Sequence, residues 1–331
     1  MLSPARRLIA LKALPGLSAL PPRQLLSLGR SATVSRAAGG ELLQEAGVMP
    51  ERSLLVASGS VRIERDGEAP EVVRPFELVG GWAVLAGEPT SYAAVAAEPT
   101  TLLGFEVAEM EALIVDAFDL YRTVLQSLAH ALVTSGGAEL QAAPSTRVSA
   151  ALATAQREEV VARLPLVAAL DELGGLPLHV AAALAKGLRR RRVAAGEVLW
   201  EPEERKTHAL IALDPGLVAS FREAGRSGGG RPVPPGRLLG FEEALSGDER
   251  RYRLVARRDA TVLELPRRIL LDELEDDPRA ARAFLREIAR RVVRRSGLAG
   301  LRHRRPSAGT WTAGKRTISA PRRSMHRGEA P

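Results

Sequence analysis

Several residue types and patterns that mark common protein classes are missing from this sequence. Cysteine is absent from all 331 residues, which excludes disulfide frameworks, thiolate nucleophiles and cysteine-ligated zinc or iron–sulfur sites. Aromatic residues make up only 4% of the chain, which argues against the base-stacking surfaces of single-strand nucleic-acid binders. No apolar run reaches the roughly 18 residues that a membrane-spanning helix needs. We therefore expect a cytoplasmic protein without a membrane span.

The net charge of +8 is distributed unevenly along the chain. Residues 1–145 hold 11 basic and 16 acidic side chains, residues 146–301 hold 28 and 22, and residues 302–331 hold 8 and 1. The last stretch also lacks apolar periodicity and is rich in Arg, Ser, Gly and Pro, which predicts a disordered basic tail. Nucleic-acid binding, if it occurs, is expected to be non-specific and to use this tail.

The chain contains an internal repeat. Leu14 to Leu20 recurs as Leu164 to Leu170, and the turn around Gly40 recurs around Gly196. The longest match has an offset of 160 residues, and its paired positions are Leu78, Gly80, Leu85, Gly87, Tyr92, Val95, Ala96, Leu103 and Phe105 with Leu238, Gly240, Leu245, Gly247, Tyr252, Val255, Ala256, Leu263 and Leu265. Because the order is kept and the offset changes little, we expect two homologous lobes.

Periodicity within each lobe predicts the fold class. Short apolar runs with turn signals every 8–12 residues are typical of an antiparallel sandwich or barrel. Each lobe ends in a helical apolar stripe, around Val124 to Val133 and again around Phe284 to Val293. We expect an α+β, mainly β protein made of two tandem β-roll or jelly-roll lobes, each closed by C-terminal helices. The predicted boundaries are 1–133 for the first lobe, 134–148 for a linker, 149–301 for the second lobe and 302–331 for the tail. We expect the second lobe to begin with a helix from about Ala150 to Ala162.

Each lobe resembles the cyclic-nucleotide-binding domain, the β-roll of catabolite-activator-type regulators and protein kinase A regulatory subunits. The resemblance rests on the opening Leu-Pro-x-x-x-x-Leu, the Gly-Glu-x-Leu turn, the turns at Gly59 and Gly216, and the closing helices. The central segments Gly80 to Gly87 and Gly240 to Gly247 complete the pattern.

The resemblance implies a phosphate-binding cassette in each lobe. In the family, a short helix offers N–H groups to a cyclic phosphate, an Arg pairs with its charge, and a Glu accepts from the ribose. The corresponding residues of the second lobe are Gly240, Glu242, which stands one position late, and Arg250 or Arg251. The first-lobe counterparts are Gly80 and Thr90 or Ser91, so that cassette is degenerate. The alternative is that Arg250, Arg251 and Arg253 are solvated surface charges paired with Asp248 and Glu249.

The last predicted helix carries a stripe of arginines at a spacing of four residues: Arg282, Arg286, Arg290 and Arg294. Like charges at this spacing repel one another, so the stripe is a poor choice for helix stability alone. It is either a solvated face or a contact site for an anionic partner.

The function predicted from these observations is that of a non-enzymatic regulatory or sensor protein whose output passes through protein contacts. The five histidines show no metal-ligand spacing and no nucleophile motif occurs, so we expect no metal, cofactor or catalytic residue. A cyclic nucleotide is the candidate ligand, and a protein is the expected partner. The alternatives are a scaffold or adaptor that binds no ligand, and a nucleic-acid-associated protein acting through the basic helix and tail. The sequence leaves the oligomeric state open.

Overall fold

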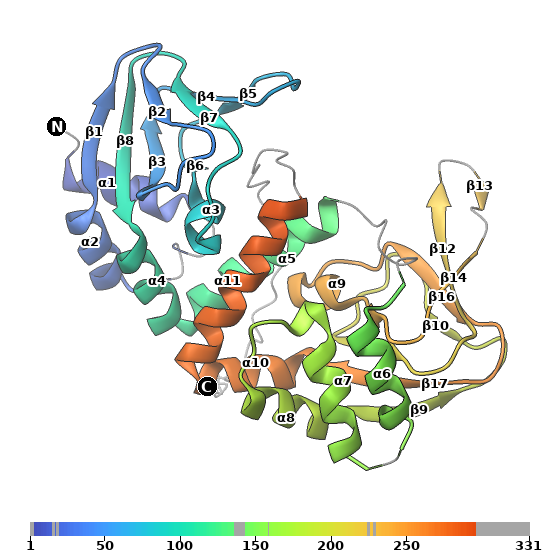
Figure 1. Ribbon diagram of the computed structural model, residues 1–331. Helices are drawn as coiled ribbons and strands as arrows, with labels where there is room; N and C mark the ends of the chain where they lie inside the picture. Colours follow the sequence, from blue (N-terminus) through green and yellow to red (C-terminus); the bar gives the residue numbers. More distant parts are fainter. Residues whose placement is uncertain are drawn as a thin grey trace, which may run out of the picture.

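The computed structural model describes residues 3–14, 17, 20–135, 143–157, 159–223, 226–227 and 230–295. The predicted tail, residues 302–331, and residues 136–142 of the predicted linker lie outside the described residues. Figure 1 shows two lobes, each with its β-roll toward the outside of the molecule and with helices between the two rolls. The predicted α+β class with two tandem β-rolls is confirmed, although helices contribute more of the chain than strands.

The first lobe is a roll of two antiparallel sheets enclosed by helices. One sheet has the strand order β1-β8-β3-β6 and the other the order β2-β7-β4-β5. The elements of this lobe are α1 (Pro4–Lys12), α2 (Pro22–Ser31), β1 (Thr33–Ala37), β2 (Leu42–Gln44), β3 (Arg52–Ser58), β4 (Val61–Glu64), β5 (Glu71–Val73), β6 (Leu78–Val79), α3 (Gly81–Ala86), β7 (Ala93–Ala96), β8 (Thr100–Glu106), α4 (Val107–Asp116) and α5 (Phe118–Thr134).

The second lobe repeats this topology. Its sheets have the orders β9-β17-β11-β15 and β10-β16-β12, with β13 and β14 both pairing with β12. Its elements are α6 (Thr146–Ala155), the 3-10 turn η3 (Val161–Arg163), α7 (Leu164–Ala169), the 3-10 turn η4 (Asp171–Leu173), α8 (Leu178–Gly187), β9 (Arg189–Val193), β10 (Val198–Trp200), β11 (His208–Ala212), β12 (Leu217–Glu223), β13 (Arg226–Ser227), β14 (Arg231–Pro232), β15 (Leu238–Leu239), α9 (Phe241–Ser246), β16 (Tyr252–Ala256), β17 (Ala260–Pro266), α10 (Arg267–Asp276) and α11 (Pro278–Arg295).

The helix that opens the second lobe differs from its prediction. Helix α6 begins at Thr146, because the Ser145 side chain accepts a hydrogen bond from the Val148 N–H and caps the first turn. It ends at Ala155, so the predicted helical stretch to Ala162 is wrong, and the 3-10 turn η3 follows as a separate element. With these bounds, α6 buries the side chains of Val148, Ala151 and Ala155 in the core.

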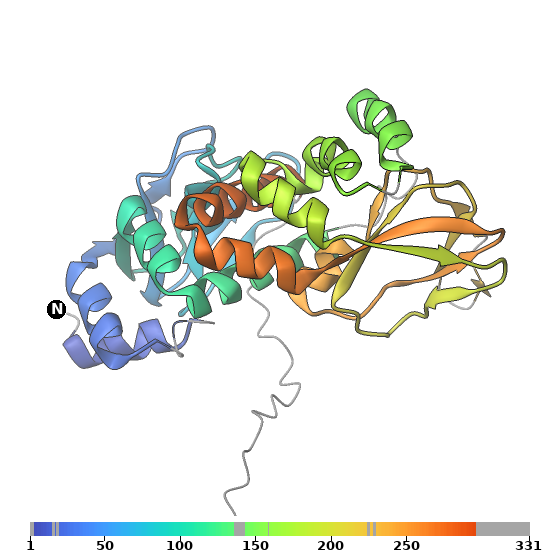
Figure 2. The same ribbon diagram turned by 90° about the horizontal axis from the view of Figure 1, so that it is seen from below.

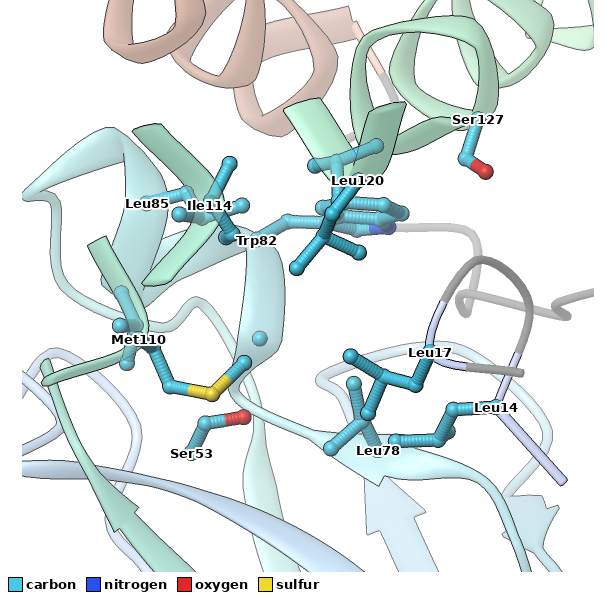
Figure 3. A pocket seen from close by; sticks show the side chains of 13 residues that line it. Leu14, Leu17, Ser53, Leu78, Trp82, Leu85, Met110, Ile114, Leu120 and Ser127 are labelled. Carbon is cyan, nitrogen blue, oxygen red and sulfur yellow. The ribbon is translucent and has the colours of Figure 1, made fainter. Parts of the chain in front are cut away.

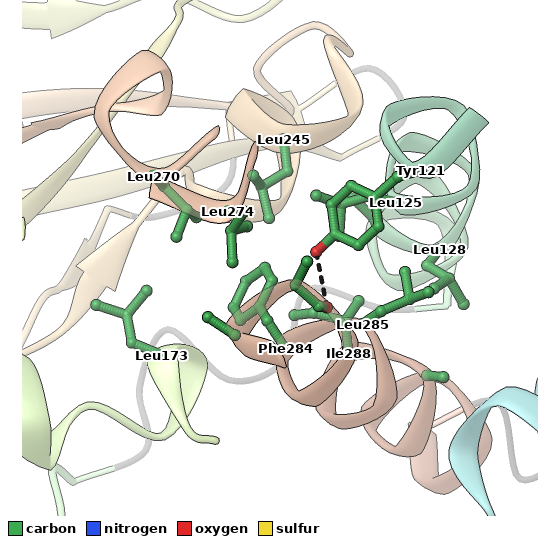
Figure 4. Close-up of a cluster of buried hydrophobic side chains, with 14 of the residues drawn as sticks. Tyr121, Leu125, Leu128, Leu173, Leu245, Leu270, Leu274, Phe284, Leu285 and Ile288 are labelled. Carbon is green, nitrogen blue, oxygen red and sulfur yellow. Dashed lines mark hydrogen bonds between the residues drawn. The ribbon is translucent and has the colours of Figure 1, made fainter. Parts of the chain in front are cut away.

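The largest apolar core crosses from one lobe to the other. Buried side chains of α5 and α11 meet there with residues of both rolls, whereas each roll also has a smaller core of its own. In Figure 4 the side chains of Leu125 and Leu128 on α5 lie against Leu285 and Ile288 on α11. Seen from below, these helices lie between the two rolls (Figure 2). Among the described residues, no helix combines the length and apolar character required to cross a membrane.

Candidate functional site

The second-lobe cassette begins at a position that only glycine can occupy without backbone strain. Gly240 has a φ of +66°, in the left-handed region, and directly precedes α9. A β-carbon at this position would lie 2.0 Å from a terminal nitrogen of Arg250. The guanidinium group of Arg250 therefore occupies the space that a side chain at position 240 would need.

Arg250 points inward, and both terminal nitrogens of its guanidinium donate to carbonyls of the protein itself, whereas its buried Nε has no hydrogen-bond partner among the described residues. The residue is 1% exposed. One terminal nitrogen donates to the carbonyl of Gly240, and the other donates to the carbonyl of His208 at 2.5 Å. The guanidinium carbon stands 4.4 Å from the ring centroid of Trp200, within cation–π range. Burial lowers the pKa of Arg250, and the carboxylate of Glu243 opposes this effect.

The carboxylate that reaches this arginine is Glu243 and not Glu242. Glu243 is 2% exposed and lies 3.7 Å from a terminal nitrogen of Arg250 and 3.3 Å from Nε of Arg251. Glu242 turns away from the roll and forms an ion pair of 2.8 Å with Arg291 of α11. Sequence reasoning missed Glu243 because the family pattern places its carboxylate directly after the glycine. The available signal was a second acidic residue in the first turn of α9.

Arg251 and Asp248 connect the second-lobe cassette to the closing helix of the first lobe. Arg251 donates to the carbonyl of Val133, in the last turn of α5, where carbonyl groups lack helical partners and cations are favourable. His130 of the same helix contacts the Asp248 carboxylate at 2.7 Å through its Nδ1 atom. The alternative of solvated surface charges is therefore wrong for Arg250, which is buried, and Arg251 pairs with Glu243 and not with Asp248 or Glu249. Arg253 is a surface charge, but its partner is Glu201.

In the first lobe a neutral threonine stands where the second lobe has Arg250. Thr90 is 2% exposed, and its hydroxyl lies 3.2 Å from the carbonyls of Glu45 and Tyr92. Its backbone bonds to Gly47 and Val48 repeat those of Arg250 to Glu203 and Glu204, which fixes the correspondence. The next residue, Ser91, is exposed.

The start of the first-lobe cassette is held by a tyrosine. Gly80 has a φ of +79°, and its N–H donates to the Tyr92 hydroxyl at 3.0 Å. The structure therefore brings Gly80 and Thr90 into the positions of Gly240 and Arg250, but it provides no guanidinium there.

Arginines of α11 contact the first-lobe cassette and its neighbour α4. Arg290 donates through Nε to the carbonyl of Ala86, at the end of α3, with a distance of 3.0 Å. Arg290 and Arg294 also approach Glu88 at 3.8 and 3.3 Å. Arg286 pairs with Glu111 of α4 at 2.8 Å.

The predicted arginine stripe thus faces the acidic first lobe for most of its length, whereas Arg282 is exposed. Neither of the two readings considered from the sequence, a solvated face or a separate anionic partner, included this intramolecular arrangement. Contact between the stripe and a separate anionic molecule stays a prediction.

The docking contacts on the two sides are related by the repeat. His130 and Arg290 are 160 residues apart, as are Glu88 and Asp248, so the pairs His130–Asp248 and Arg290–Glu88 are equivalent. The closing helix of each lobe therefore docks on the cassette of the other lobe. Among the residues that the structure describes, no group of three or more His, Asp or Glu side chains is arranged to hold a metal ion.

Comparison with known proteins agrees with this topology. Residues 34–116 match the family model of the cyclic nucleotide-binding domain. No curated protein sequence matches the chain.

Three similar solved structures are of protein kinase A regulatory proteins. The regulatory domain of Toxoplasma gondii PKA with cAMP is 16% identical, with 82% of this chain and 94% of that chain covered and a TM-score of 0.32. The regulatory subunit of a cAMP-independent protein kinase A from Trypanosoma brucei is 15% identical, with 82% and 88% covered and a TM-score of 0.32. The Trypanosoma cruzi regulatory subunit bound to guanosine is 15% identical, with 84% and 90% covered and a TM-score of 0.32.

The topology and the family match together define the class of protein. Residues 34–116 of the first lobe match the cyclic nucleotide-binding domain, and the second lobe repeats the strand order and the closing helices of the first. The chain therefore has two tandem lobes of this topology, and its cassettes depart from the family pattern at Gly81, Phe241 and Thr90.

Proposed function

We propose that this chain is a non-enzymatic regulatory protein that acts through protein contacts and does not use a cyclic nucleotide as its ligand. In this proposal each cassette serves as the docking site for the closing helix of the other lobe. We call these two contact regions, α5 on the second-lobe cassette and α11 on the first-lobe cassette, the joint between the lobes. Ligand binding by Gly240, Glu242, Arg250 and Arg251, as the resemblance implies, is the competing hypothesis.

The burial of Arg250 carries the proposal. A guanidinium that binds a phosphate must offer paired donors to it. In the second lobe these donors already contact the carbonyls of Gly240 and His208, and the side chain is closed off from solvent between Trp200 and α9. A phosphate would have to displace these contacts. The Gly240 carbonyl would keep its hydrogen bond from the Ala244 N–H, whereas the His208 carbonyl would lose the guanidinium donor, at a cost of roughly 1–3 kcal/mol.

The first-lobe cassette supports the same conclusion by a different route. Thr90 offers one hydroxyl where a guanidinium would be needed, and that hydroxyl contacts carbonyl groups of the roll. The cassette helix α3 begins with Gly81 and Trp82 and contains no charged side chain. A cyclic phosphate there would therefore meet no guanidinium from residue 90 and no charged side chain from α3.

The remaining cassette groups serve the contact between the lobes. Arg251 and Asp248 hold α5, while Ala86 and Glu88 hold α11. A protein with two lobes fixed in this way presents one composite surface, which suits a protein that regulates a partner by contact.

Isothermal titration calorimetry of the full chain with cAMP and cGMP tests the proposal. We expect no saturable binding at ligand concentrations up to about 1 mM, a range in which weak sites are still detectable. Saturable binding would contradict the proposal. If that binding disappeared in Arg250→Ala and persisted in the matched control Arg253→Ala, it would establish the cassette as a nucleotide site.

A further inference from the structure

The first lobe contains an apolar cavity outside its β-roll core. The cavity has a volume of about 70 Å³ and lies between α3, α4, α5, the start of the chain and strand β3. Figure 3 shows Trp82, Leu120, Met110 and Leu17 around it, with Ser53 on one side. None of the described residues that line this space carries a charge. A single water needs only about 10–15 Å³, so the cavity has room for a larger molecule.

The cavity corresponds to a region of the second lobe that large side chains occupy. Gly81 and Val124 line the cavity, and the residues 160 positions later are Phe241 and Phe284. Both phenylalanines are buried, at 3% and 0% exposure, and belong to the core that joins the lobes. At these two positions the first lobe therefore has much smaller side chains than the second lobe. In a well-packed protein such an unfilled volume costs stability, so a molecule that fills it gains contact energy.

The Ser53 hydroxyl is a polar group in the otherwise largely apolar wall of the cavity. Its side chain is 2% exposed, and its hydroxyl has no hydrogen-bond partner among the described residues. In Figure 3 the hydroxyl is directed toward the interior of the cavity. The other hydroxyl at the cavity, on Ser127, donates to the carbonyl of Thr123 at 3.0 Å and is satisfied. Ser53 pairs with Phe105 in the ladder between β3 and β8, a position at which the second lobe has Ala209 paired with Leu265.

We propose that this cavity binds a small uncharged molecule with an apolar ring or short chain and one hydrogen-bonding group. The apolar walls favour the hydrocarbon part, and the Ser53 hydroxyl favours a single polar group placed next to β3. The walls disfavour a phosphate or carboxylate, because no cationic side chain of the described lining residues could compensate for its desolvation. The site is separate from the cassette contacts at Thr90 and does not depend on the function proposed above.

A molecule in the cavity would contact two helices that take part in the contact between the lobes. Its walls include Trp82 and Leu85 on α3 and Leu120 and Val124 on α5. Helix α3 is the element on which α11 docks, and α5 is the helix that docks on the second-lobe cassette. A molecule that fills the space between α3 and α5 is therefore expected to stabilise the paired arrangement of the lobes.

Two probes of equal ring size test the inference on the full chain. Benzyl alcohol carries the ring and a hydroxyl, and toluene carries the ring alone. Calorimetry should detect saturable binding of both probes, with a dissociation constant of about 1 mM or lower. Ser53→Ala, which copies the second lobe, should weaken benzyl alcohol about three- to tenfold and leave toluene unchanged, as expected for one lost hydrogen bond. The control Ser127→Ala should change neither.

Filling the cavity provides the second arm of the test. Gly81→Phe and Val124→Phe each introduce the aromatic side chain of the second lobe, and each should abolish binding of both probes while circular dichroism shows a folded chain. Gly81 tolerates a side chain, because a β-carbon there meets its nearest neighbours at 3.6 Å. Val124→Phe keeps the test decisive should Gly81→Phe fail to fold. Absence of binding to the unmodified chain, or unchanged affinity in a folded cavity-filling variant, would overturn the inference.

Discussion

The Tyr121 hydroxyl donates a hydrogen bond of 3.0 Å to the carbonyl of Ala281, the residue that stands exactly one repeat of 160 positions later (Figure 4). Each of the two residues thus contacts its own counterpart in the other lobe. Such a contact arises where a two-fold axis relates two copies of one surface, as in the interface of a symmetric dimer. Helices α5 and α11 of this single chain are therefore packed as the two equivalent helices of a symmetric dimer would be.

Removal of this contact should weaken the pairing of the lobes. Tyr121 is fully buried, and Tyr121→Phe deletes one buried hydrogen bond without changing the ring. We expect the free energy of unfolding in urea to fall by about 1 kcal/mol. Tyr252→Phe is the matched control, because the buried hydroxyl of Tyr252 has no partner among the described residues and its loss should cost nothing. Equal losses in the two variants would show that the Tyr121 hydroxyl does not join the lobes.

Ion pairs between the lobes should make stability depend on salt. Glu88 approaches both Arg290 and Arg294 of α11, so Glu88→Gln removes two contacts across the joint. At low salt we expect a loss of up to about 1 kcal/mol, since these pairs are only partly exposed. At roughly 1 M salt most of that loss should disappear, because the screening length is then about 3 Å.

The control for this experiment is Glu64→Gln. Glu64 pairs with Arg62 inside one strand, so its replacement leaves the joint intact. Urea unfolding at the two salt concentrations should show a smaller and less salt-dependent change in this variant. A Glu88→Gln effect no larger than that of Glu64→Gln would contradict the assignment of Glu88 to the joint.

The two cassette glycines should respond differently to alanine. Gly80 and Gly240 both have positive φ, so each substitution costs roughly 1–2 kcal/mol from the backbone alone. At Gly240 the new β-carbon would also lie 2.0 Å from Arg250, whereas at Gly80 its nearest neighbours are 3.6 Å away. We therefore expect Gly240→Ala to lower the thermal midpoint further than Gly80→Ala. Adding Arg250→Ala to Gly240→Ala should relieve the clash, and a double variant whose losses simply add would show that Arg250 does not fill this space.

Stability should also depend on pH through the residue that precedes α11. The carboxylate of Asp277 accepts hydrogen bonds from the Ala280 and Arg279 N–H groups and contacts His179, and these bonds lower its pKa below the ordinary 3.8. A carboxyl whose pKa is lower in the folded state stabilises the fold at pH values above its unfolded pKa. That contribution disappears as the pH falls through the lower folded value.

Asp277→Ala should therefore cost about 1 kcal/mol at pH 6, the usual effect of losing a helix cap. The difference from the unmodified chain should shrink below the ordinary aspartate pKa of 3.8. Unfolding curves at several pH values measure this, with the exposed neighbour Asp276→Ala as the control. A cost that stays constant from pH 6 to pH 3 would rule out the capping carboxylate as its source.

Much of the fold could be predicted because its signals are local. Alternating apolar residues and turn glycines indicated the strands, and the order of motifs around Gly80 and Gly240 revealed the repeat. The boundary of α6 was misplaced, since the cap at Ser145 competes with the longer helical pattern that follows it. Local patterns thus define the elements but locate their ends less well.

The site was less predictable because its contacts are not local. Arg286 pairs with Glu111, a residue 175 positions earlier, and no periodicity in α11 points to that partner. The inward carboxylate of Glu243 could not be separated from Glu242 by type, since adjacent residues on a short helix differ only in the face they occupy. The cavity beside Gly81 became visible only when the two lobes could be compared position by position in three dimensions.

The most direct test of the joint between the lobes uses the absence of cysteine. Arg30 and Lys186 are exposed, equivalent positions on α2 and α8, so Arg30→Cys with Lys186→Cys adds one labelling site to each lobe. Pulsed electron–electron double resonance between spin labels at these sites then measures the distance across the molecule. We expect one narrow distance distribution that saturating cAMP leaves unchanged. A broad distribution without ligand, or a shift on adding cAMP, would contradict the claim that the cassettes hold the lobes together and need no cyclic nucleotide.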